Sequence, residues 1–469
     1  MKTLFNKPSE RHRRNIKPFL TVVFLSLVAV SFSQEKVSDS TKIETLDEVL
    51  VRAVRVEATS PITHTNVSKE ELAKRNLGQD IPILLNYLPS VVTTSDAGAG
   101  IGYTGIRVRG VSAQSTNITI NGIPYNDAES LGTFWVNLGD FASSVENLQL
   151  QRGVGTSTNG SGAFGASVNI LTDAVSNEAG GEISNSFGSF NTRKHTVKFS
   201  TGRMYLNKKR KRITDRQTFT LDTEPPTMRT TETITEEIDT SEPSVEISGR
   251  LSNITSDGYI DRASTDLKSY FLQGAYVDDN TLIKAVVFGG NEVTYQSWFG
   301  IDAETLATNR TFNPAGQYTD EEGNVRFHDN EVDDYSQDHY QLHWNQRYNN
   351  LWSTTVSFNY TYGRGFFEQF REDDDFSTYG FEPLTVDGET VNTTDLIRRR
   401  WLDNDFYVVN ANANYRNNGL DMTFGAFFSH YDGDHFGEVI WARFASQSNI
   451  RDRYYEGNGI KNELSFFAK

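Results

Sequence analysis

The stretch LLNYLPSVVTTSDAGAGIGYTGIRVRGVSAQSTNITINGIPYNDAESLGTFWVNLGDFASSVENLQLQRGVGTSTNGSGAFGASVNILT, residues 84–172, decides the fold of this chain. It contains four short segments in which apolar and polar residues alternate: IRVRG (106–110), NITINGIPYN (117–126), ENLQLQRG (146–153) and ASVNILT (166–172). Alternation of this kind, bounded by Gly, Ser, Thr and Asn, is typical of strands joined by turns. The stretch therefore predicts a compact α+β module rather than a linker.

The segments around these strands predict short helices and an apolar loop. Ser68-Lys-Glu-Glu and Gln79-Asp-Ile-Pro carry the capping and acidic residues of helix starts. Residues 126–140 carry an apolar cluster with Phe134 and Trp135. We expect this loop to pack against a surrounding wall of strands.

The first 33 residues carry an export pattern. Six basic residues lie among the first 18, and the apolar run Phe19–Val30 and the small-residue site Ser31–Ser33 follow them. This order is that of a secretory signal peptide. The apolar run is shorter than the ~20 residues that a membrane-spanning helix needs. We expect residues 1–33 to be removed on export.

The composition limits the function without settling the class. Hydrophobic residues make up only 37% of the chain and the mean hydropathy is −0.51, yet aromatic residues reach 12%. A transmembrane barrel gives this combination, because one face of each strand meets lipid and the other meets water; a soluble all-β protein fits the composition equally well. The net charge of −16 argues against nucleic acid as a partner. The absence of cysteine excludes disulfides and thiolate chemistry.

Long alternating segments follow Gly180 to the end of the chain. They lie near residues 181–187, 192–201, 244–253, 266–277, 281–296, 336–348, 351–367, 399–416, 420–441 and 460–469. Several exceed ten residues, which suits a tilted transmembrane strand of ~9–11 residues with an extension. Tight turns alternate with long, acidic connections, the long ones at 298–335, 370–398 and 442–459. Short turns at one end and long loops at the other are typical of outer-membrane barrels.

One connection breaks this rule. Residues 207–242 fall where a short turn is expected, open with the basic run 208–212 and continue as a Thr/Glu-rich segment. A charged, low-hydrophobicity segment of this kind predicts an inserted and mostly disordered excursion.

The order of these parts resembles the plug domain of TonB-dependent outer-membrane receptors. Five elements carry the resemblance: a leucine-rich segment ending in Pro, an R-x-R-G strand, a strand–NG–strand hairpin, an E-x-L-x-L-x-R-G strand and a Gly/Ser/Ala-rich strand, here at 84–89, 107–110, 118–125, 146–153 and 160–170. The resemblance implies a mainly β protein with an α+β plug domain at 52–175. About the first ten of 22 antiparallel transmembrane barrel strands would then occupy 180–469. Since a plug cannot fit inside ten strands, we expect the chain to be a truncated receptor.

The resemblance also assigns a contact to the tail at 34–51. A TonB-type energy-coupling protein would add a strand to the strand-prone run there, by β-augmentation. The residues expected to make this contact are Leu46, Asp47, Glu48, Val49, Leu50 and Val51. Alternatively, residues 49–56 form the first strand of the plug, and the two readings can overlap.

Two further groups of residues receive roles from the resemblance. Charged contacts that hold the plug to the barrel are expected from Arg107, Arg109, Glu146 and Arg152, which could also be ordinary surface charges. Ligand contacts are expected from a plug loop and a long loop, at Tyr103, Thr104, Trp298 and Phe299. Aromatic loop residues can equally lie at the membrane interface.

No catalytic or metal site emerges from the sequence. Residues 160–165 match G-x-G-x-x-G, but the strand-like ASVNILT follows where a dinucleotide site needs a helix. His339 and His343 lack the acid of a zinc hydrolase motif, and the acidic run 372–375 is typical of a solvated loop. We expect no enzyme and no cofactor, although the substrate can be a metal chelate.

The resemblance implies a receptor in the outer membrane of a Gram-negative cell, in contact with its lipid. It would import a scarce small-molecule nutrient, such as an iron–siderophore or a cobalamin-like solute, with energy from a TonB-type partner. Two alternatives stay open at this point. One is a surface adhesin or passive barrel without energised transport, and the other is a secreted soluble β-protein.

Overall fold

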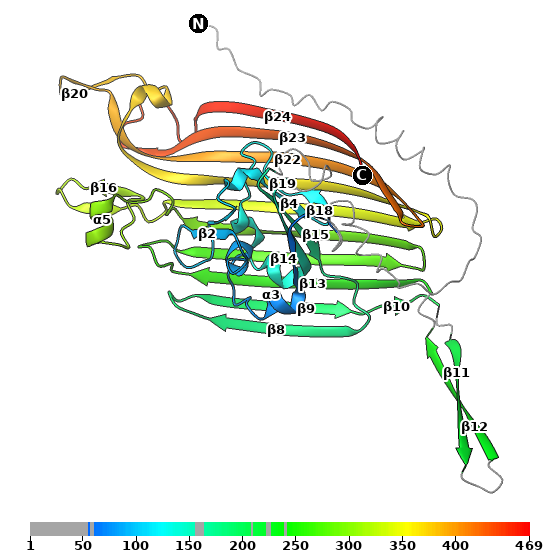
Figure 1. The fold of residues 1–469 in the computed structure, drawn as a ribbon. Helices are drawn as coiled ribbons and strands as arrows, with labels where there is room; N and C mark the ends of the chain where they lie inside the picture. Colours follow the sequence, from blue (N-terminus) through cyan, green and yellow to red (C-terminus); the bar gives the residue numbers. More distant parts are fainter. Residues whose placement is uncertain (1–54, 57–60, 155–163, 208–209, 222–226, 239–241) are drawn as a thin grey trace. The chain divides into compact units, whose positions relative to one another are not determined.

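The computed structural model describes residues 55–56, 61–154, 164–207, 210–221, 227–238 and 242–469. The expected signal peptide, at 1–33, and the expected TonB contact, at 46–51, lie outside these residues. Two sheets organise the described chain: a five-stranded sheet in an N-terminal module (residues 55–175) and an 11-stranded sheet after it, here called the large sheet (Figure 1).

The N-terminal module is built on the sheet β1-β6-β7-β4-β5. Its strands are β1 (His64–Ser68), β4 (Thr116–Ile120), β5 (Ile123–Pro124), β6 (Val145–Arg152) and β7 (Ala166–Thr172). Strands β4 and β7 pair in parallel and the other neighbours are antiparallel. The turn between β4 and β5 has positive φ at Asn121 and Gly122, the conformation that an Asn-Gly hairpin favours. A separate ladder joins β2 (Val91–Ser95) and β3 (Thr104–Val108).

Both predicted helix starts are confirmed. Helix α3 (Lys69–Ala73) begins after Ser68, whose hydroxyl accepts a hydrogen bond from the Glu71 N–H at 3.3 Å. Helix α4 (Ile81–Leu84) begins after Asp80 and has Pro in its first turn. Three short 3₁₀ turns complete the module: η2 (Ala113–Ser115), η3 (Trp135–Leu138) and η4 (Phe141–Ser144).

The large sheet is antiparallel throughout, in the order β24-β23-β22-β19-β18-β15-β14-β13-β9-β8. All ten predicted strand segments coincide with its strands. Their bounds are β8 (Ala179–Phe187), β9 (Arg193–Thr201), β13 (Ser244–Ser256), β14 (Thr265–Val277), β15 (Thr281–Tyr295), β18 (Val332–Arg347), β19 (Trp352–Asp375), β22 (Thr393–Asn417), β23 (Leu420–Ala442) and β24 (Arg453–Ala468). The short β10 (Met204–Tyr205) pairs with the end of β13.

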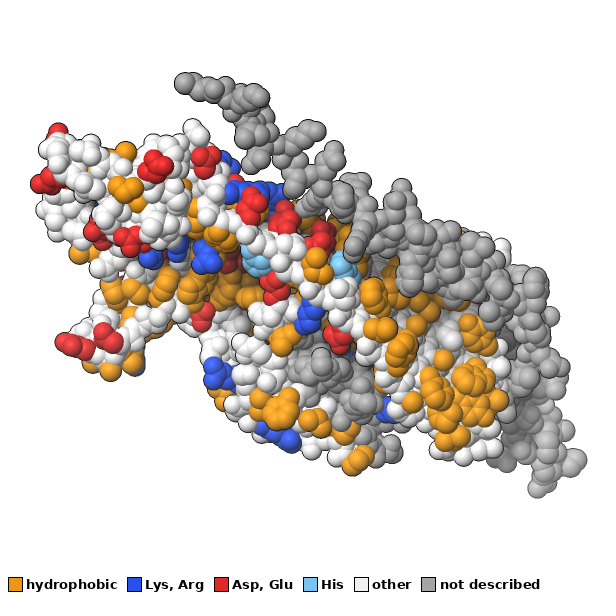
Figure 2. Space-filling view, turned by 90° about the horizontal axis from the view of Figure 1, so that it is seen from above, with side chains coloured by type: hydrophobic (Ala, Val, Ile, Leu, Met, Phe, Trp, Pro, Cys, Tyr) orange, Lys and Arg blue, Asp and Glu red, His pale blue; other side chains and the backbone are white. Residues whose placement is uncertain are grey.

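The expected segregation of connection lengths is confirmed. At one end, the sheet has tight turns, as at 278–280, where the Asp278 carboxylate accepts hydrogen bonds from the N–H groups of Asn280 and Thr281. At the other end, long connections carry their own small elements. These are α5 (Ala303–Thr308), the ladder β16–β17 (Gln317–Thr319, Val325–Phe327), η6 (Phe376–Tyr379) and the ladder β20–β21 (Leu384–Val386, Glu389–Val391). Acidic side chains gather on this end, on the left of Figure 2.

The predicted disorder of 207–242 is wrong for most of that segment. Strands β11 (Arg210–Leu221) and β12 (Thr227–Ile238) pair along their whole length as a hairpin. The register places Arg212 opposite Glu236 and Arg216 opposite Glu232. The two strands therefore pair in register although the composition of the segment predicts disorder.

The N-terminal module and the large sheet share one hydrophobic core. It joins the strands of the module to Phe271, Val286 and Phe288 of β14 and β15. In the predicted apolar loop, Trp135 is buried in this core whereas Phe134 is 44% exposed. The expected packing against the strands is thus confirmed for Trp135 only.

The polarity of the large sheet is inverted relative to a soluble protein. On β18, the polar residues Gln341 and His343 are buried, whereas their neighbours Tyr340 and Leu342 are exposed. Exposed apolar side chains recur on the strands around it, among them Phe199, Leu251, Leu272, Phe428 and Phe466. An apolar outward face and a polar inward face are typical of a transmembrane barrel wall and argue against a soluble β-protein. No described helix is long and apolar enough to cross a membrane.

Candidate functional site

The N-terminal module is held to the large sheet by a buried carboxylate, that of Asp140. This residue precedes η4 with a left-handed φ of 51°. Its carboxylate lies 2.6 Å from the Lys194 ammonium and 3.4 Å from the Arg250 guanidinium. It also accepts hydrogen bonds from the hydroxyls of Thr196 (2.6 Å) and Ser252 (2.8 Å). The four partners lie on β9 and β13, so a single side chain of the module binds two strands of the large sheet.

These partners keep Asp140 charged although it is buried. Burial alone would raise its pKa, but the charges of Arg250 and Lys194 outweigh this effect and lower the pKa to about 2. Both cations are at most 2% exposed at their side chains. Removing one member of a buried charge group leaves the others without compensation, which typically costs about 3–5 kcal/mol.

A second carboxylate, that of Asp173, lies just after β7. It pairs with Lys198 of β9 at 2.6 Å and with Lys69 of α3 at 2.7 Å. The Asp173 carbonyl also accepts a hydrogen bond from the Lys284 ammonium of β15 at 2.7 Å. Ionic contacts thus fasten the module to β9, β13 and β15.

Two of the four residues expected to hold the module, Glu146 and Arg152, make contacts inside it. Glu146 pairs with Lys69 at 3.1 Å, and Arg152 donates to the Pro89 carbonyl at 3.1 Å and to the Thr65 hydroxyl at 2.9 Å. Arg107 and Arg109 are exposed. A role in releasing the module stays a prediction for these four. The buried ion pairs that cross to the sheet come from Asp140 and Asp173, which the sequence analysis missed.

Three of the four predicted ligand residues meet at the end with the long connections. The ring of Tyr103, in the loop before β3, stands edge-on to Trp298 with centroids 5.3 Å apart. Trp298 contacts Phe299 at 6.2 Å and Phe367 of β19 at 6.4 Å. The Tyr103 hydroxyl donates to Asp333 and lies 3.4 Å from Glu292. The loop of the module is thereby linked to β15 and β18.

Thr104 is placed differently. Its hydroxyl donates to the buried Asp80 carboxylate at 2.8 Å. In this structure the Thr104 side chain therefore stabilises the module through Asp80, and its predicted ligand contact stays a prediction.

The aromatic contacts continue to a cation that sequence reasoning missed. The Arg400 guanidinium of β22 lies 5.4 Å from the Phe367 ring and 5.5 Å from the Tyr455 ring of β24, and it donates to the Tyr455 hydroxyl at 3.2 Å. Arg400 is exposed, and no carboxylate of the described chain lies within ion-pairing distance of it. The register places Phe367 opposite Arg400, on the same face of the sheet. We call the run Tyr103, Trp298, Phe367, Arg400 and Tyr455 the aromatic path.

The histidine pair, the G-x-G-x-x-G match and the acidic run, for which no function is expected, make contacts within the fold. His339 and His343 are buried in β18, where Phe288 stacks on His339 at 4.5 Å and Ser357 bonds His343 at 2.8 Å. Strand β7 follows the G-x-G-x-x-G match, as expected. In the acidic run, Asp374 bonds Arg371 and Tyr379. Within the described residues, no cluster of His, Asp or Glu could hold a metal ion.

Comparison with known proteins identifies the N-terminal module. The family model of the TonB-dependent receptor plug domain matches residues 56–167. The chain is 26% identical over 189 residues to the probable TonB-dependent siderophore receptor PirA of Acinetobacter baumannii. It is 26% identical over 156 residues to the ferric enterobactin receptor of Pseudomonas aeruginosa. These alignments cover 36% and 31% of this chain, and 25% and 21% of the two relatives.

Solved structures share the fold at low sequence identity. P. aeruginosa FpvA bound to a heterologous pyoverdine matches with a TM-score of 0.53 at 10% identity, over 87% of this chain and 49% of FpvA. The ferric citrate transporter FecA matches with a TM-score of 0.54 at 11% identity, over 87% of this chain and 53% of FecA. This chain therefore spans about half the length of these proteins.

The N-terminal module is thus a TonB-dependent receptor plug, and the chain has the fold of TonB-dependent receptors: a plug followed by antiparallel strands of the barrel wall. Proteins of this class are receptors and transporters rather than enzymes, in agreement with the prediction of no catalytic site.

Proposed function

We propose that this protein is an outer-membrane receptor that binds an iron–siderophore and imports it with energy from a TonB-type partner. The observation that carries the proposal is the contact of Tyr103 with Trp298, since it joins the plug to a long connection at the end of the aromatic path. Aromatic rings offer large contact areas at a small entropic cost, which suits capture of a dilute solute. The relatives named above as siderophore and ferric enterobactin receptors support an iron chelate as that solute.

Two levels of aromatic residues support a place in the membrane. Tyr340, Tyr360 and Tyr407 stack across three neighbouring strands, with centroids 5.8 and 4.9 Å apart. Trp352 and Tyr415 pack at 4.9 Å near the short turns. Aromatic girdles at both interfaces flank the apolar band of outer-membrane barrels. The long connections, and the aromatic path with them, then face the cell exterior.

Binding of a ferric siderophore can be tested through Trp298, the tryptophan of the aromatic path. Ferric siderophores of several classes are titrated into the full chain in detergent, and tryptophan fluorescence is followed. We expect at least one to quench the fluorescence, and Trp298→Leu to weaken its binding about tenfold or more. The matched control is Trp352→Leu, since Trp352 is 40% exposed and Trp298 37%, but Trp352 lies at the opposite end of the strands. Equal effects of the two substitutions would contradict the proposed site.

Energised transport is tested separately at Val49, which lies outside the described residues. Val49→Pro removes a backbone donor from the strand that the partner would pair with. In iron-starved cells we expect ferric siderophore uptake to fail while surface binding persists, and Val37→Pro, in the same tail, to leave uptake intact. Uptake that survives Val49→Pro would favour the passive barrel or adhesin.

A further inference from the structure

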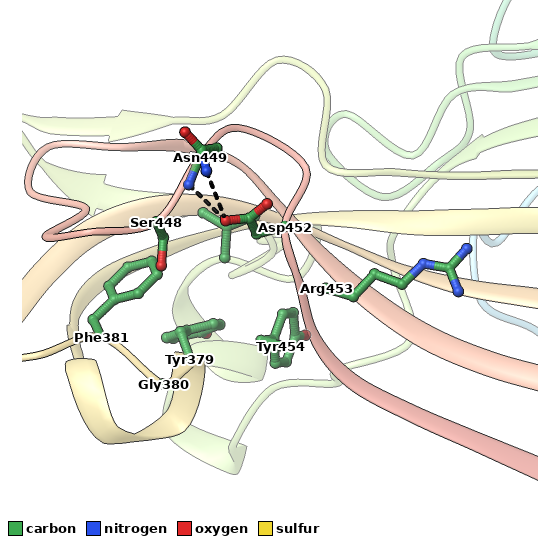
Figure 3. Close-up of a pocket in the computed structure, with 9 residues that line it drawn as sticks. Tyr379, Gly380, Phe381, Ser448, Asn449, Asp452, Arg453 and Tyr454 are labelled. Carbon is green, nitrogen blue, oxygen red and sulfur yellow. Dashed lines mark hydrogen bonds between the residues drawn. The ribbon is translucent and has the colours of Figure 1, made fainter. Parts of the chain in front are cut away.

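A cavity lies between two of the long connections (Figure 3), and its residue Tyr454 packs at 5.0 Å against Tyr455 of the aromatic path. Its volume is 410 Å³, within the range of small-molecule pockets, about 300–1,000 Å³. It is lined by the connection after β19, by the connection between β23 and β24 and by the adjoining ends of these two strands, among them Tyr379, Phe381, Asn449, Asp452 and Tyr454.

The walls of the cavity are fixed in place before any ligand arrives. The Gln447 side chain accepts a hydrogen bond from the Glu382 N–H at 3.3 Å and donates to the Gly380 carbonyl at 3.2 Å, which ties the two connections together. The Arg451 N–H donates to the Val439 carbonyl at 2.8 Å. A preformed cavity binds without the entropic cost of ordering its walls.

One side of the cavity is aromatic. The ring of Tyr379 packs against Phe381 at 5.8 Å and Tyr454 at 4.8 Å, over a buried cluster that includes Phe376 and Leu396. The Tyr379 hydroxyl is already engaged, since it donates to Asp374 at 2.7 Å and accepts from Arg398 at 3.1 Å. The Tyr454 hydroxyl is also buried, beside the Arg398 guanidinium, so the rings of the two tyrosines and not their hydroxyls are available to a ligand.

The other side of the cavity is polar and rich in acceptors. Asn449 donates to one Asp452 oxygen from its backbone, at 2.7 Å, and from its side chain, at 3.4 Å (Figure 3). The second Asp452 oxygen and the Asn449 carbonyl oxygen are further acceptors, and Ser448 adds a hydroxyl. The Arg453 guanidinium extends away from these groups, stacking on Phe436 at 3.7 Å and pairing with Glu456 at 3.0 Å.

These groups select the chemistry of a ligand. No cation of the described residues pairs with the Asp452 carboxylate, which therefore repels phosphates, carboxylates and other anions. The Arg398 guanidinium, which donates to the Tyr379 hydroxyl and does not line the cavity, places a positive charge behind the aromatic side and disfavours an ammonium ligand there. A neutral sugar satisfies both sides, because its hydroxyls donate to the acceptors and its C–H face packs on the rings. We propose that this cavity, beside the aromatic path, binds one neutral, hydroxyl-rich sugar unit, and this proposal does not rest on the siderophore function.

Saturation-transfer NMR on the full chain in a sugar-free detergent tests this site, with methyl glycosides of neutral hexoses as probes. We expect saturation to reach the ring protons of at least one glycoside, and Asn449→Ala to weaken its binding about tenfold. Asn324→Ala, on a long connection outside the cavity, is the control. Asp452→Asn keeps the shape of the rim while removing its charge. We expect it to admit a hexuronate that the unchanged protein rejects.

Two arms of the experiment separate the sources of such a sugar. Binding of free glycosides supports a soluble saccharide, and binding only to vesicles that carry a neutral glycolipid supports a sugar of the membrane surface. Either result supports the cavity if Asn449→Ala reduces it and Asn324→Ala does not. The proposal is overturned if neither probe binds, if both alanine variants behave alike, or if charged sugars bind more tightly than neutral ones.

Discussion

Two buried carboxylates of the plug, Asp140 and Asp80, have opposite energetic consequences. Asp140 meets two cations, and its pKa falls to about 2. Asp80 has no cationic partner among the described residues; burial raises its pKa well above the usual value, and the hydrogen bonds from Thr104 and Gly102 only partly offset this. At neutral pH, a charged Asp140 therefore stabilises the plug, whereas a charged Asp80 costs stability.

Asp140→Asn is expected to loosen the plug by about 3–5 kcal/mol at neutral pH, because Lys194 and Arg250 lose their counter-charge. Hydrogen exchange of the amides in β6 and β7 measures this loss. In the unchanged protein, the contribution of Asp140 is fully present above its unfolded pKa of 3.8 and is lost as the pH falls toward 2. Glu70→Gln, at an exposed carboxylate of the same module, should change nothing. Equal protection in both variants would show that Asp140 does not anchor the plug.

Asp80→Asn is expected to act in the opposite direction. The pKa of Asp80 is higher in the folded state than in the unfolded state, so its contribution is present below pH 3.8 and is lost as the pH rises through the folded value. Asparagine keeps an acceptor for Thr104 without a buried charge. Amides of β3 and α4 should thus exchange more slowly in the variant at pH 7, with a smaller difference at pH 4. Faster exchange of these amides in Asp80→Asn at pH 7 would contradict a destabilising charge on Asp80.

The missed site residues show why single residues are hard to place from sequence. Tyr103 and Trp298 were predicted through the resemblance, because loop aromatics stand out locally. The Asp140 cluster joins residues of η4, β9 and β13 that no local pattern connects. Arg400 shares a face with Phe367 only through the register of β19 and β22. Contacts of this kind depend on strand pairing, which periodicity does not supply.

At the scale of elements, the sequence predicts most of the structure. All ten long strands follow from period-two alternation, and both plug helices from their capping residues. The hairpin β11–β12 is the exception, because its strand pairing does not follow from the charged, weakly hydrophobic composition of the segment. The amino-acid composition of a segment does not show which strands will pair with one another.

The hairpin is expected to be dispensable for stability. The Leu206 N–H donates to the Pro243 carbonyl at 2.8 Å, which closes the base of the insertion. Replacing residues 207–242 with Asn-Gly should leave hydrogen exchange in β9 and β13 unchanged, because a tight turn can join those strands there. The control replaces another short turn, Asn418-Gly419, with Gly-Gly and measures how much a changed turn alone alters hydrogen exchange. Faster exchange in β13 than in that control would show that the hairpin supports the sheet.

For the whole molecule, the inverted polarity of the large sheet predicts how it responds to charge. Val356 lies on the outward face of β19, midway between Trp352 and Tyr360. A lysine near the middle of the apolar band costs about 2–4 kcal/mol in outer-membrane barrels. Val356→Lys should therefore reduce the folded fraction in lipid vesicles. Val325→Lys, at a 57% exposed site on a long connection, should not. Similar losses from both would contradict a lipid-facing sheet.

The contacts of the plug are unevenly distributed among the strands around it. Its buried charges are held by β9 and β13, whereas its contacts with the later strands include exposed ones, such as Glu129 with His435 at 2.8 Å and the Ala128 carbonyl with Lys461 at 2.9 Å. If the proposed partner pulls on the N-terminal tail, we expect the exposed contacts with β23 and β24 to break before the buried ion pairs of Asp140, because exposed ion pairs are individually weak. The plug would then rotate about Asp140 and open a gap along β22 to β24, without leaving the sheet.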